Sequence, residues 1–194
     1  MSLDVITQAQ WQTQRWQNGG GITHQLCRQD DEHGMLWRLS VAEVATDGPF
    51  SRFEHIDRVI MLLDGSGFSL YGTGAEPQVL DTALTPFSFA GDTAIHCRLS
   101  GGAVRDFNLM TRRGKLTAAL QVLPVYSKPQ RLALSPQTIL FVARGQVEAD
   151  VNSQNYNVDT EHSLLLSDES GTLQLSASNA AKVVFIRLDA ATER

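Results

Sequence analysis

Three polar residues, Arg58, Asp106 and Asn108, stand in apolar segments whose length suits β-strands. A core strand gains nothing from such side chains, so they either face solvent or line a cavity. A guanidinium binds a carboxylate through two parallel hydrogen bonds, an Asn amide donates and accepts, and an Asp carboxylate accepts. These groups together suit a small polar acid. An Arg58–Asp106 ion pair that only joins two strands is the alternative, and the residues leave both open.

Strand alternation decides which of these side chains share a face. Along residues 104–112 it places Asp106, Asn108 and Met110 on one side of a strand, with Phe107 and Leu109 on the other. The pattern does not say which side turns inward. Arg58 begins a neighbouring apolar segment, so a cavity on the polar side would bring all three groups together.

A run of three glycines, Gly19 to Gly21, lies between Trp16 and Thr23. Glycines allow positive φ or a close approach of two backbones, but this run matches neither a dinucleotide fingerprint nor a P-loop. Trp16 and Asn18 would flank a cavity mouth in one interpretation. A bulged edge strand with Trp16 in the core is the other, and these residues alone favour it.

The histidines do not form a recognisable metal motif. The five of them make no HxH or HxxxH pair, and only His55 and His96 could serve a barrel metal site. Arg58, three residues after His55, would repel a cation there. We therefore expect no metal and no other cofactor. No nucleophilic triad is recognisable from spacing, and whether the protein is an enzyme stays open.

Composition limits the classes of partner. The 194 residues carry a net charge of -5, and the one basic cluster, Arg112 to Lys115, is too short for nucleic acid. No apolar run approaches the roughly 20 residues of a membrane helix, and residues 1–10 do not resemble a signal peptide. Cys27 and Cys97 have the pattern of free thiols. We expect a cytoplasmic protein that binds neither nucleic acid nor membrane.

Short alternating segments separated by Gly, Pro and Asp turns predict an all-β barrel or sandwich. Asp64-Gly65 predicts a hairpin between the segments on either side of it. The expected strands are 36–44, 58–63, 68–71, 79–80, 87–89, 95–99 and 107–110.

Three segments recur in the same order about 80 residues later, which indicates a duplicated unit. Residues 60–65, 86–92 and 104–112 resemble residues 139–145, 163–169 and 182–189. We predict two domains, 1–120 with the pocket and a smaller one over 121–194, and we interpret 122–136 as their connection. In this comparison Gln137, Val184 and Ile186 replace Arg58, Asp106 and Asn108, so only the first domain would hold a site.

Six motifs follow one another over residues 11–114: Trp16-x-Asn18-Gly19-Gly20-Gly21-x-Thr23, Trp37-Arg38-x-Ser40, Asp47-Gly48-Pro49-Phe50-Ser51, Arg58-x-Ile60-x-Leu62-Leu63-x-Gly65, Phe87-x-Phe89-x-Gly91-Asp92 and Asp106-Phe107-Asn108-Leu109-Met110. Together they resemble the HutD/Ves family, and the resemblance continues more weakly to about residue 190. The resemblance implies a duplicated cupin-type β-barrel (a bicupin with RmlC-like jelly rolls) without the usual cupin metal ligands. It also implies pocket residues Trp16, Asn18, Thr23, Arg58, Asp106 and Asn108.

The resemblance implies a regulatory or accessory protein of histidine utilisation that binds a small carboxylate, such as formylglutamate. Arg58 would hold the carboxylate, and Asn108 and Asn18 would bond an amide or formyl group. Asp106 would orient Arg58 or accept an N–H, and Trp16 would cover the mouth.

One position departs from the family pattern. Gln25 stands where relatives often carry Glu, which weakens a catalytic interpretation more than a binding one. The alternative is a cupin-type enzyme (isomerase, hydrolase or metal-dependent oxygenase) that acts on a small polar metabolite. A third interpretation is an interaction protein whose barrels form dimer interfaces, and a homodimer is left open.

Overall fold

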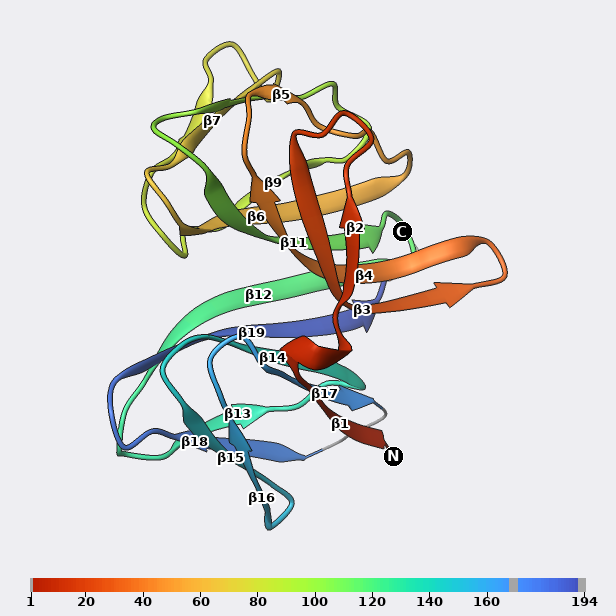
Figure 1. Ribbon diagram of the computed structural model, residues 1–194. Helices are drawn as coiled ribbons and strands as arrows, with labels where there is room; N and C mark the ends of the chain where they lie inside the picture. Colours follow the sequence, from red (N-terminus) through yellow and green to blue (C-terminus); the bar gives the residue numbers. More distant parts are fainter. Residues whose placement is uncertain (1, 168–170, 192–194) are drawn as a thin grey trace. The chain divides into compact units, whose positions relative to one another are not determined.

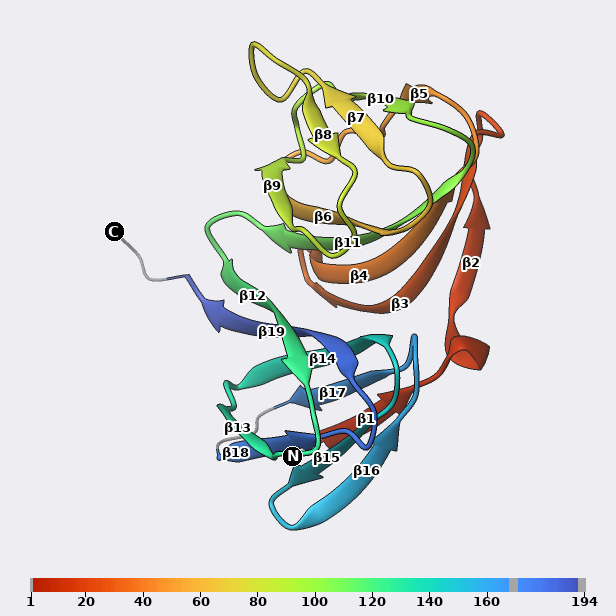
Figure 2. The same ribbon diagram turned by 90° about the vertical axis from the view of Figure 1, so that its left-hand side faces the viewer.

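The computed structural model describes residues 2–167 and 171–191, and its contacts divide the chain into two compact units. The first unit is Trp11–Lys115, and the second joins Met1–Gln10 to Leu116–Arg194. Both are built from β-strands, which confirms the all-β prediction (Figures 1 and 2). Within the described residues, no helix has the length and apolar character to cross a membrane.

The first unit contains two antiparallel sheets. The larger has the strand order β2 (Gln12–Arg15), β3 (Gly21–Asp31), β4 (Gly34–Val44), β11 (Val104–Arg112), β6 (Ile56–Asp64) and β9 (Phe87–Ala90). The smaller has the order β5 (Gly48–Pro49), β10 (His96–Leu99), β7 (Phe68–Tyr71) and β8 (Gln78–Leu80).

The second unit also contains two sheets. The larger has the order β1 (Ser2–Ile6), β17 (Ser163–Ser167), β14 (Gln137–Arg144), β19 (Ala181–Ala190) and β12 (Leu116–Val125). The smaller has the order β13 (Gln130–Ala133), β18 (Thr172–Ser176), β15 (Val147–Val151) and β16 (Gln154–Val158). A short 3-10 helix, η1 (Gln8–Gln10), follows β1.

Each unit has its core between its two sheets. In the first unit Ile60 and Leu62 of β6 pack with Phe68 and Leu70 of β7, and all four are fully or almost fully buried. Alternation along each strand produces this inner face, and each such side chain contributes roughly 1.5–3 kcal/mol by leaving water.

The sheets of the described residues are open, and no unit closes into a single barrel. The prediction of a hairpin at Asp64-Gly65 is also wrong. β7 pairs with β10 and β8 rather than with β6, so the turn carries the chain from one sheet to the other. Gly65 has φ +105°, and a Cβ there would lie 2.9 Å from the Ala103 carbonyl oxygen. The glycine therefore serves a crossing rather than a hairpin.

The interpretation of residues 122–136 as a connection is also wrong. This stretch includes the end of β12 and all of β13, which belong to the two sheets of the second unit. At the other end of the chain, β1 pairs with β17 from Ser2↔Ser167 to Ile6↔Ser163. The first residues therefore complete a sheet whose other strands all lie beyond residue 115.

The two units share one strand order. The series β4-β11-β6-β9 in the first corresponds to β12-β19-β14-β17 in the second, and β5-β10-β7-β8 corresponds to β13-β18-β15-β16. A register shift lies at the same place in both: the pairing skips Leu63 of β6 opposite Arg105 and Asp106, and it skips Ala143 of β14 opposite Lys182 and Val183. This shared irregularity fixes which residues correspond.

The register aligns Leu62↔Asp106 with Val142↔Val183. The counterparts of Arg58, Asp106 and Asn108 are therefore Thr138, Val183 and Phe185, one residue away from those expected from the sequence. Two matches introduced these errors, Ile60 to Ile139 and Val104 to Lys182, each off by one residue. A shift of one residue exchanges the two faces of a strand.

Candidate functional site

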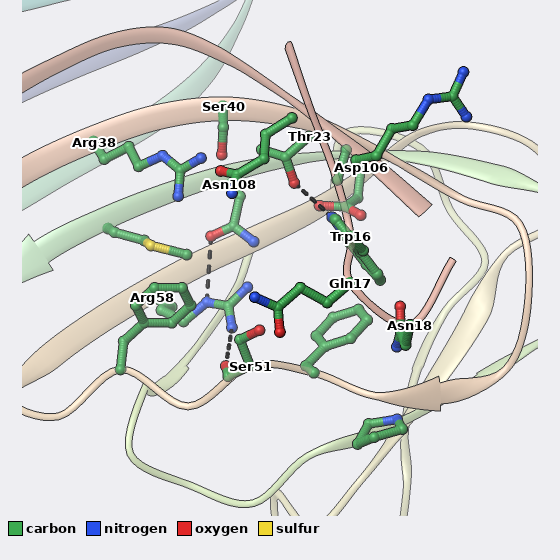
Figure 3. A pocket seen from close by; sticks show the side chains of 17 residues that line it. Trp16, Gln17, Asn18, Thr23, Arg38, Ser40, Ser51, Arg58, Asp106 and Asn108 are labelled. Atoms are coloured by element: carbon green, nitrogen blue, oxygen red, sulfur yellow. Dashed lines mark hydrogen bonds between the residues drawn. The ribbon is translucent and has the colours of Figure 1, made fainter. Parts of the chain in front are cut away.

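A cavity of about 600 Å³ lies in the first unit (Figure 3). It lies on the side of β11 that carries Asp106, Asn108 and Met110, which answers the question of direction that the sequence left open. All six residues named from the sequence line this cavity: Trp16, Asn18, Thr23, Arg58, Asp106 and Asn108.

Pairing across the large sheet sets the polar groups in rows. Asn108 lies between Ser40 of β4 and Ile60 of β6, and Met110 lies between Arg38 and Arg58. The two arginines therefore enter the cavity from the strands on either side of β11. The rest of this face of the sheet is apolar, and the two arginines interrupt it with charged side chains.

Arg58 is nearly buried, with 5% of its surface exposed. Its hydrogen bonds are long: Nε donates to Asn108 Oδ1 at 3.4 Å and Nη1 donates to the Ser51 carbonyl at 3.5 Å (Figure 3). Burial lowers the pKa of this guanidinium to about 10, against the opposing effect of the Asp106 charge, while Arg38 lowers it further. Arg58 stays charged at neutral pH, and both of its acceptors are uncharged groups.

Aromatic rings surround the Arg58 guanidinium. Its Cζ lies 4.9 Å from the ring centre of Phe89, 5.6 Å from Phe53 and 5.7 Å from Phe50. Ring faces attract a cation and also exclude water, so they hold the charge without neutralising it. An anion that entered the cavity would meet a poorly hydrated cation.

Asp106 is more deeply buried, with 1% exposed. Burial raises its pKa to about 7, although the Arg58 charge and a hydrogen bond with the Asn108 side chain lower it. Its Oδ1 has no hydrogen-bond partner in the described part of the chain. The nearby Cys97 thiol has its pKa raised to about 12, mainly by burial and then by the Asp106 charge, so it is uncharged at neutral pH.

Trp16 and Thr23 form one wall. Trp16 Nε1 donates to Thr23 Oγ1 at 2.8 Å, and the indole meets the Phe50 ring edge-on at 6.0 Å. Gly21 allows this, because a Cβ there would lie 2.5 Å from the Glu43 carbonyl oxygen and 3.1 Å from the indole. Trp16 therefore both packs on the core and lines the cavity, which joins the two interpretations of the glycine run.

Asn18 contributes less than expected. Its Oδ1 accepts a hydrogen bond from the Gly20 N–H at 3.0 Å, and its side chain belongs to an exposed turn. The acceptor is thus already used to shape the turn. The amide NH₂ is the part of Asn18 that remains for a ligand.

Sequence reasoning missed Arg38 and Ser40 as cavity residues, although both belong to a motif that carried the resemblance. Arg38 Nε has no hydrogen-bond partner among the described residues, and burial, followed by the Arg28 charge, lowers the pKa of its guanidinium. An arginine on the same strand face as Ser40 and Ala42 was the signal. Ser51 was beyond pattern reasoning, because it contributes a backbone carbonyl.

The two histidines considered for a metal do not line a common cavity. His55 lines a second cavity of about 610 Å³ in the first unit, and His96 does not. Arg112 and Arg113 line it too, but they form ion pairs with Asp31 and with Asp57 and Asp92. Within residues 2–167 and 171–191, no three His, Cys, Asp or Glu side chains gather as a metal site would require.

The family model described as HutD matches residues 8–185. The chain belongs to the HutD family. A relative from Pseudomonas putida, named as an uncharacterized 21.2 kDa protein in the hutC 3' region, is 34% identical over 152 residues, which are 77% of this chain and 78% of the relative. Protein Ves of Cronobacter sakazakii is 39% identical over 108 residues, which are 55% of this chain and 59% of Ves.

Solved structures agree with this HutD assignment. HutD from Pseudomonas fluorescens SBW25, in a formate condition, matches with a TM-score of 0.85 at 27% identity, covering 98% of this chain and all of that one. A cupin 2 conserved barrel protein from Leptotrichia buccalis matches at 9% identity with a TM-score of 0.58, covering 87% of this chain and 89% of that one. The second likeness concerns the fold alone, which is cupin-like.

Proposed function

We propose that this HutD-family protein binds a small carboxylic acid in the cavity of its first unit, as an accessory or regulatory protein of histidine utilisation. The name of the Pseudomonas putida relative, which refers to the hutC region, supports the metabolic setting. Formylglutamate, an acid of histidine breakdown, is the leading ligand. The role is binding rather than turnover.

The observation that carries the proposal is the state of Arg58. It is a buried cation whose two hydrogen bonds go to uncharged acceptors at 3.4 and 3.5 Å. Desolvation of a charge costs several kcal/mol unless a good partner is supplied. A carboxylate that accepts two short hydrogen bonds from the guanidinium would supply one.

Other cavity groups extend this recognition. Arg38 is a second cation, and its repulsion of Arg58 would be relieved by an anion between them. Asn108 lies beside Arg58 and would bond an amide or formyl group of the same ligand, using the donor that its NH₂ provides. Phe50 and Phe53 would contact the apolar part of the acid.

Isothermal titration calorimetry of the full chain with formate and N-formyl-L-glutamate tests the proposal. Formamide, which has nearly the shape of formate but no charge, is the control ligand. Arg58→Met should raise the Kd of both acids about 100-fold. Arg98→Met is the matched control, since Arg98 is an exposed arginine of the same unit that stacks on Tyr71 outside the cavity.

A ligand present at 100 times its Kd should also stabilise the fold by about 2.7 kcal/mol, measurable as a rise in Tm. Equal binding of formate and formamide would overturn the proposal. So would binding of either acid that persists unchanged in Arg58→Met.

We also infer that the two units descend from one duplicated cupin-type unit. Their shared strand order and the register shift at corresponding positions support this. A duplication explains why one unit can lose its binding groups while the other keeps them.

A further inference from the structure

We propose that Asp106 takes up one proton when an acid binds at Arg58, so that carboxylate binding and proton uptake are coupled. This inference rests on the proposed function and adds a form of regulation to it. The proton comes from solvent and stays on Asp106 while the ligand is bound. The protein would thus hold its ligand more tightly as the pH falls.

The geometry places Asp106 where it must respond to a ligand. Its carboxyl group lines the same cavity as Arg58, from the strand next to β6, and only 1% of it is exposed. Its Oδ1 is buried and makes no hydrogen bond with any of the described residues. A carboxylate in this cavity would bring a second negative charge close to an oxygen that is already unpaired.

Among the groups that face Asp106, Arg58 is the one whose charge controls whether Asp106 is ionised. Ala42 of β4 and Leu62 of β6 flank it in the sheet and do not titrate. Cys97 of β10 stays protonated. The remaining charged groups of the cavity are Arg58, Arg38 of β4 and Arg15 of β2.

Ligand binding removes the influence that keeps Asp106 ionised. In the free protein burial raises its pKa to about 7, and the Arg58 charge is the main effect that opposes the rise. A carboxylate on Arg58 cancels this charge, and it also displaces water from the cavity. The pKa of Asp106 therefore rises further in the complex. Once protonated, its O–H can donate to a ligand oxygen.

Linkage gives the sign and size of the effect. Below the free-state pKa, Asp106 is protonated in both states and the Kd is constant. Above it and below the pKa of the complex, each binding event takes up one proton, so the Kd rises about tenfold per pH unit. At still higher pH the Kd becomes constant again, at its weakest value.

The experiment is calorimetry of the full chain with N-formyl-L-glutamate from pH 5.5 to 9, in buffer pairs of different ionisation enthalpy. Near pH 8 the buffer dependence of the heat should report close to one proton taken up per ligand. Asp106→Asn keeps the shape of the side chain but cannot titrate. It should bind with a Kd that is independent of pH and with no proton uptake.

His24→Gln is the matched control, because His24 follows the cavity residue Thr23 and is bonded instead to Thr13 and Glu43. It should keep the pH slope of the unaltered protein. Binding without proton uptake, or binding that strengthens as the pH rises, would overturn the coupling and leave the proposed function standing. Absence of binding at every pH would overturn both.

Discussion

The two units place different chemistry at the same register positions. Where the first has Arg58, Asp106 and Asn108, the second has Thr138, Val183 and Phe185. Val183 and Phe185 belong to the apolar core of the second unit. Thr138 is fully buried, and its Oγ1 accepts from the Ser135 N–H and donates to the Ser135 carbonyl. One framework therefore supports either a packed interior or a polar cavity.

The edges of the two large sheets also differ. In the first unit β3 and β2 extend the sheet beyond β4, whereas β12, the counterpart of β4, is the last strand of its sheet within the described residues. Trp16 and Thr23 come from this extension. The comparison teaches that a site needed both polar substitutions on existing strands and an added wall.

The largest expected effect comes from moving the charge into the packed unit. Val183→Asp should lower the free energy of unfolding by about 3–5 kcal/mol at pH 8, because Thr138 stands at the position of Arg58 and the carboxylate would be buried in an apolar core without a charged partner. Urea denaturation of the full chain measures this. The reverse change, Asp106→Val, should leave stability equal or higher. A loss below 1 kcal/mol for Val183→Asp would show that the second unit already tolerates a charge there.

Arg58→Thr copies the second unit into the first. It should raise the Kd for N-formyl-L-glutamate about 100-fold, since hydrogen bonds to charged groups contribute about 1.5–3 kcal/mol. Calorimetry measures the Kd. Thr138→Val, at the matched position, should lower stability and leave the Kd unchanged. If Thr138→Val also weakened binding, the second unit would take part in binding, and the contrast between a binding first unit and a merely packed second unit would be wrong.

Asp106→Asn should change how stability depends on pH. In the unaltered protein burial raises the pKa of Asp106 to about 7 from the ordinary carboxyl value of 3.8, so stability falls as the pH rises between these values. Between pH 5 and 8 this group should account for about 3 kcal/mol of lost stability, which Asp106→Asn should not lose. Urea denaturation at both pH values tests this, and equal slopes for the two proteins would contradict it.

Trp16→Phe should have the smallest effect, because it removes one neutral hydrogen bond, from Trp16 Nε1 to Thr23 Oγ1. It should lower the free energy of unfolding by about 0.5–1.5 kcal/mol and weaken ligand binding by a similar free energy. Trp11→Phe is the matched control. Trp11 Nε1 is buried without a partner among the described residues, so its removal should cost nothing in hydrogen bonding. Thermal denaturation with and without ligand compares them. An equal loss of stability and of ligand affinity in both variants would show that the Trp16–Thr23 hydrogen bond contributes nothing specific to the site.

The all-β class and most strands of the first unit were predictable, because alternation and glycine turns are local signals. The segment 68–71 became β7 with the same bounds. Which strands pair was not predictable locally. The turn at Gly65 looked like a hairpin because a hairpin and a crossing between sheets both need positive φ there, and only distant partners such as β10 decide between them.

The candidate site divides in the same way. Arg58, Asp106 and Asn108 could be chosen because polar groups in apolar strands are costly, and the cavity brings them together. Their counterparts were aligned one residue off, since neighbouring registers of two apolar strands fit a list of letters nearly equally well and only strand pairing separates them. Arg38 was missed because a charged residue in an alternating strand looks like part of its solvent face.

The wall that distinguishes the first unit is also its loosest part. β2 lies at the edge of the large sheet, pairs with β3 and with no other strand of the described residues, and exposes all four of its residues. Backbone amides of such an edge exchange with deuterium through local fraying, whereas those of β11, bonded on both sides, exchange only in larger openings. The time that a ligand stays in the cavity would then be set by how often this edge frays, and hydrogen exchange at β2 would slow when the cavity is filled.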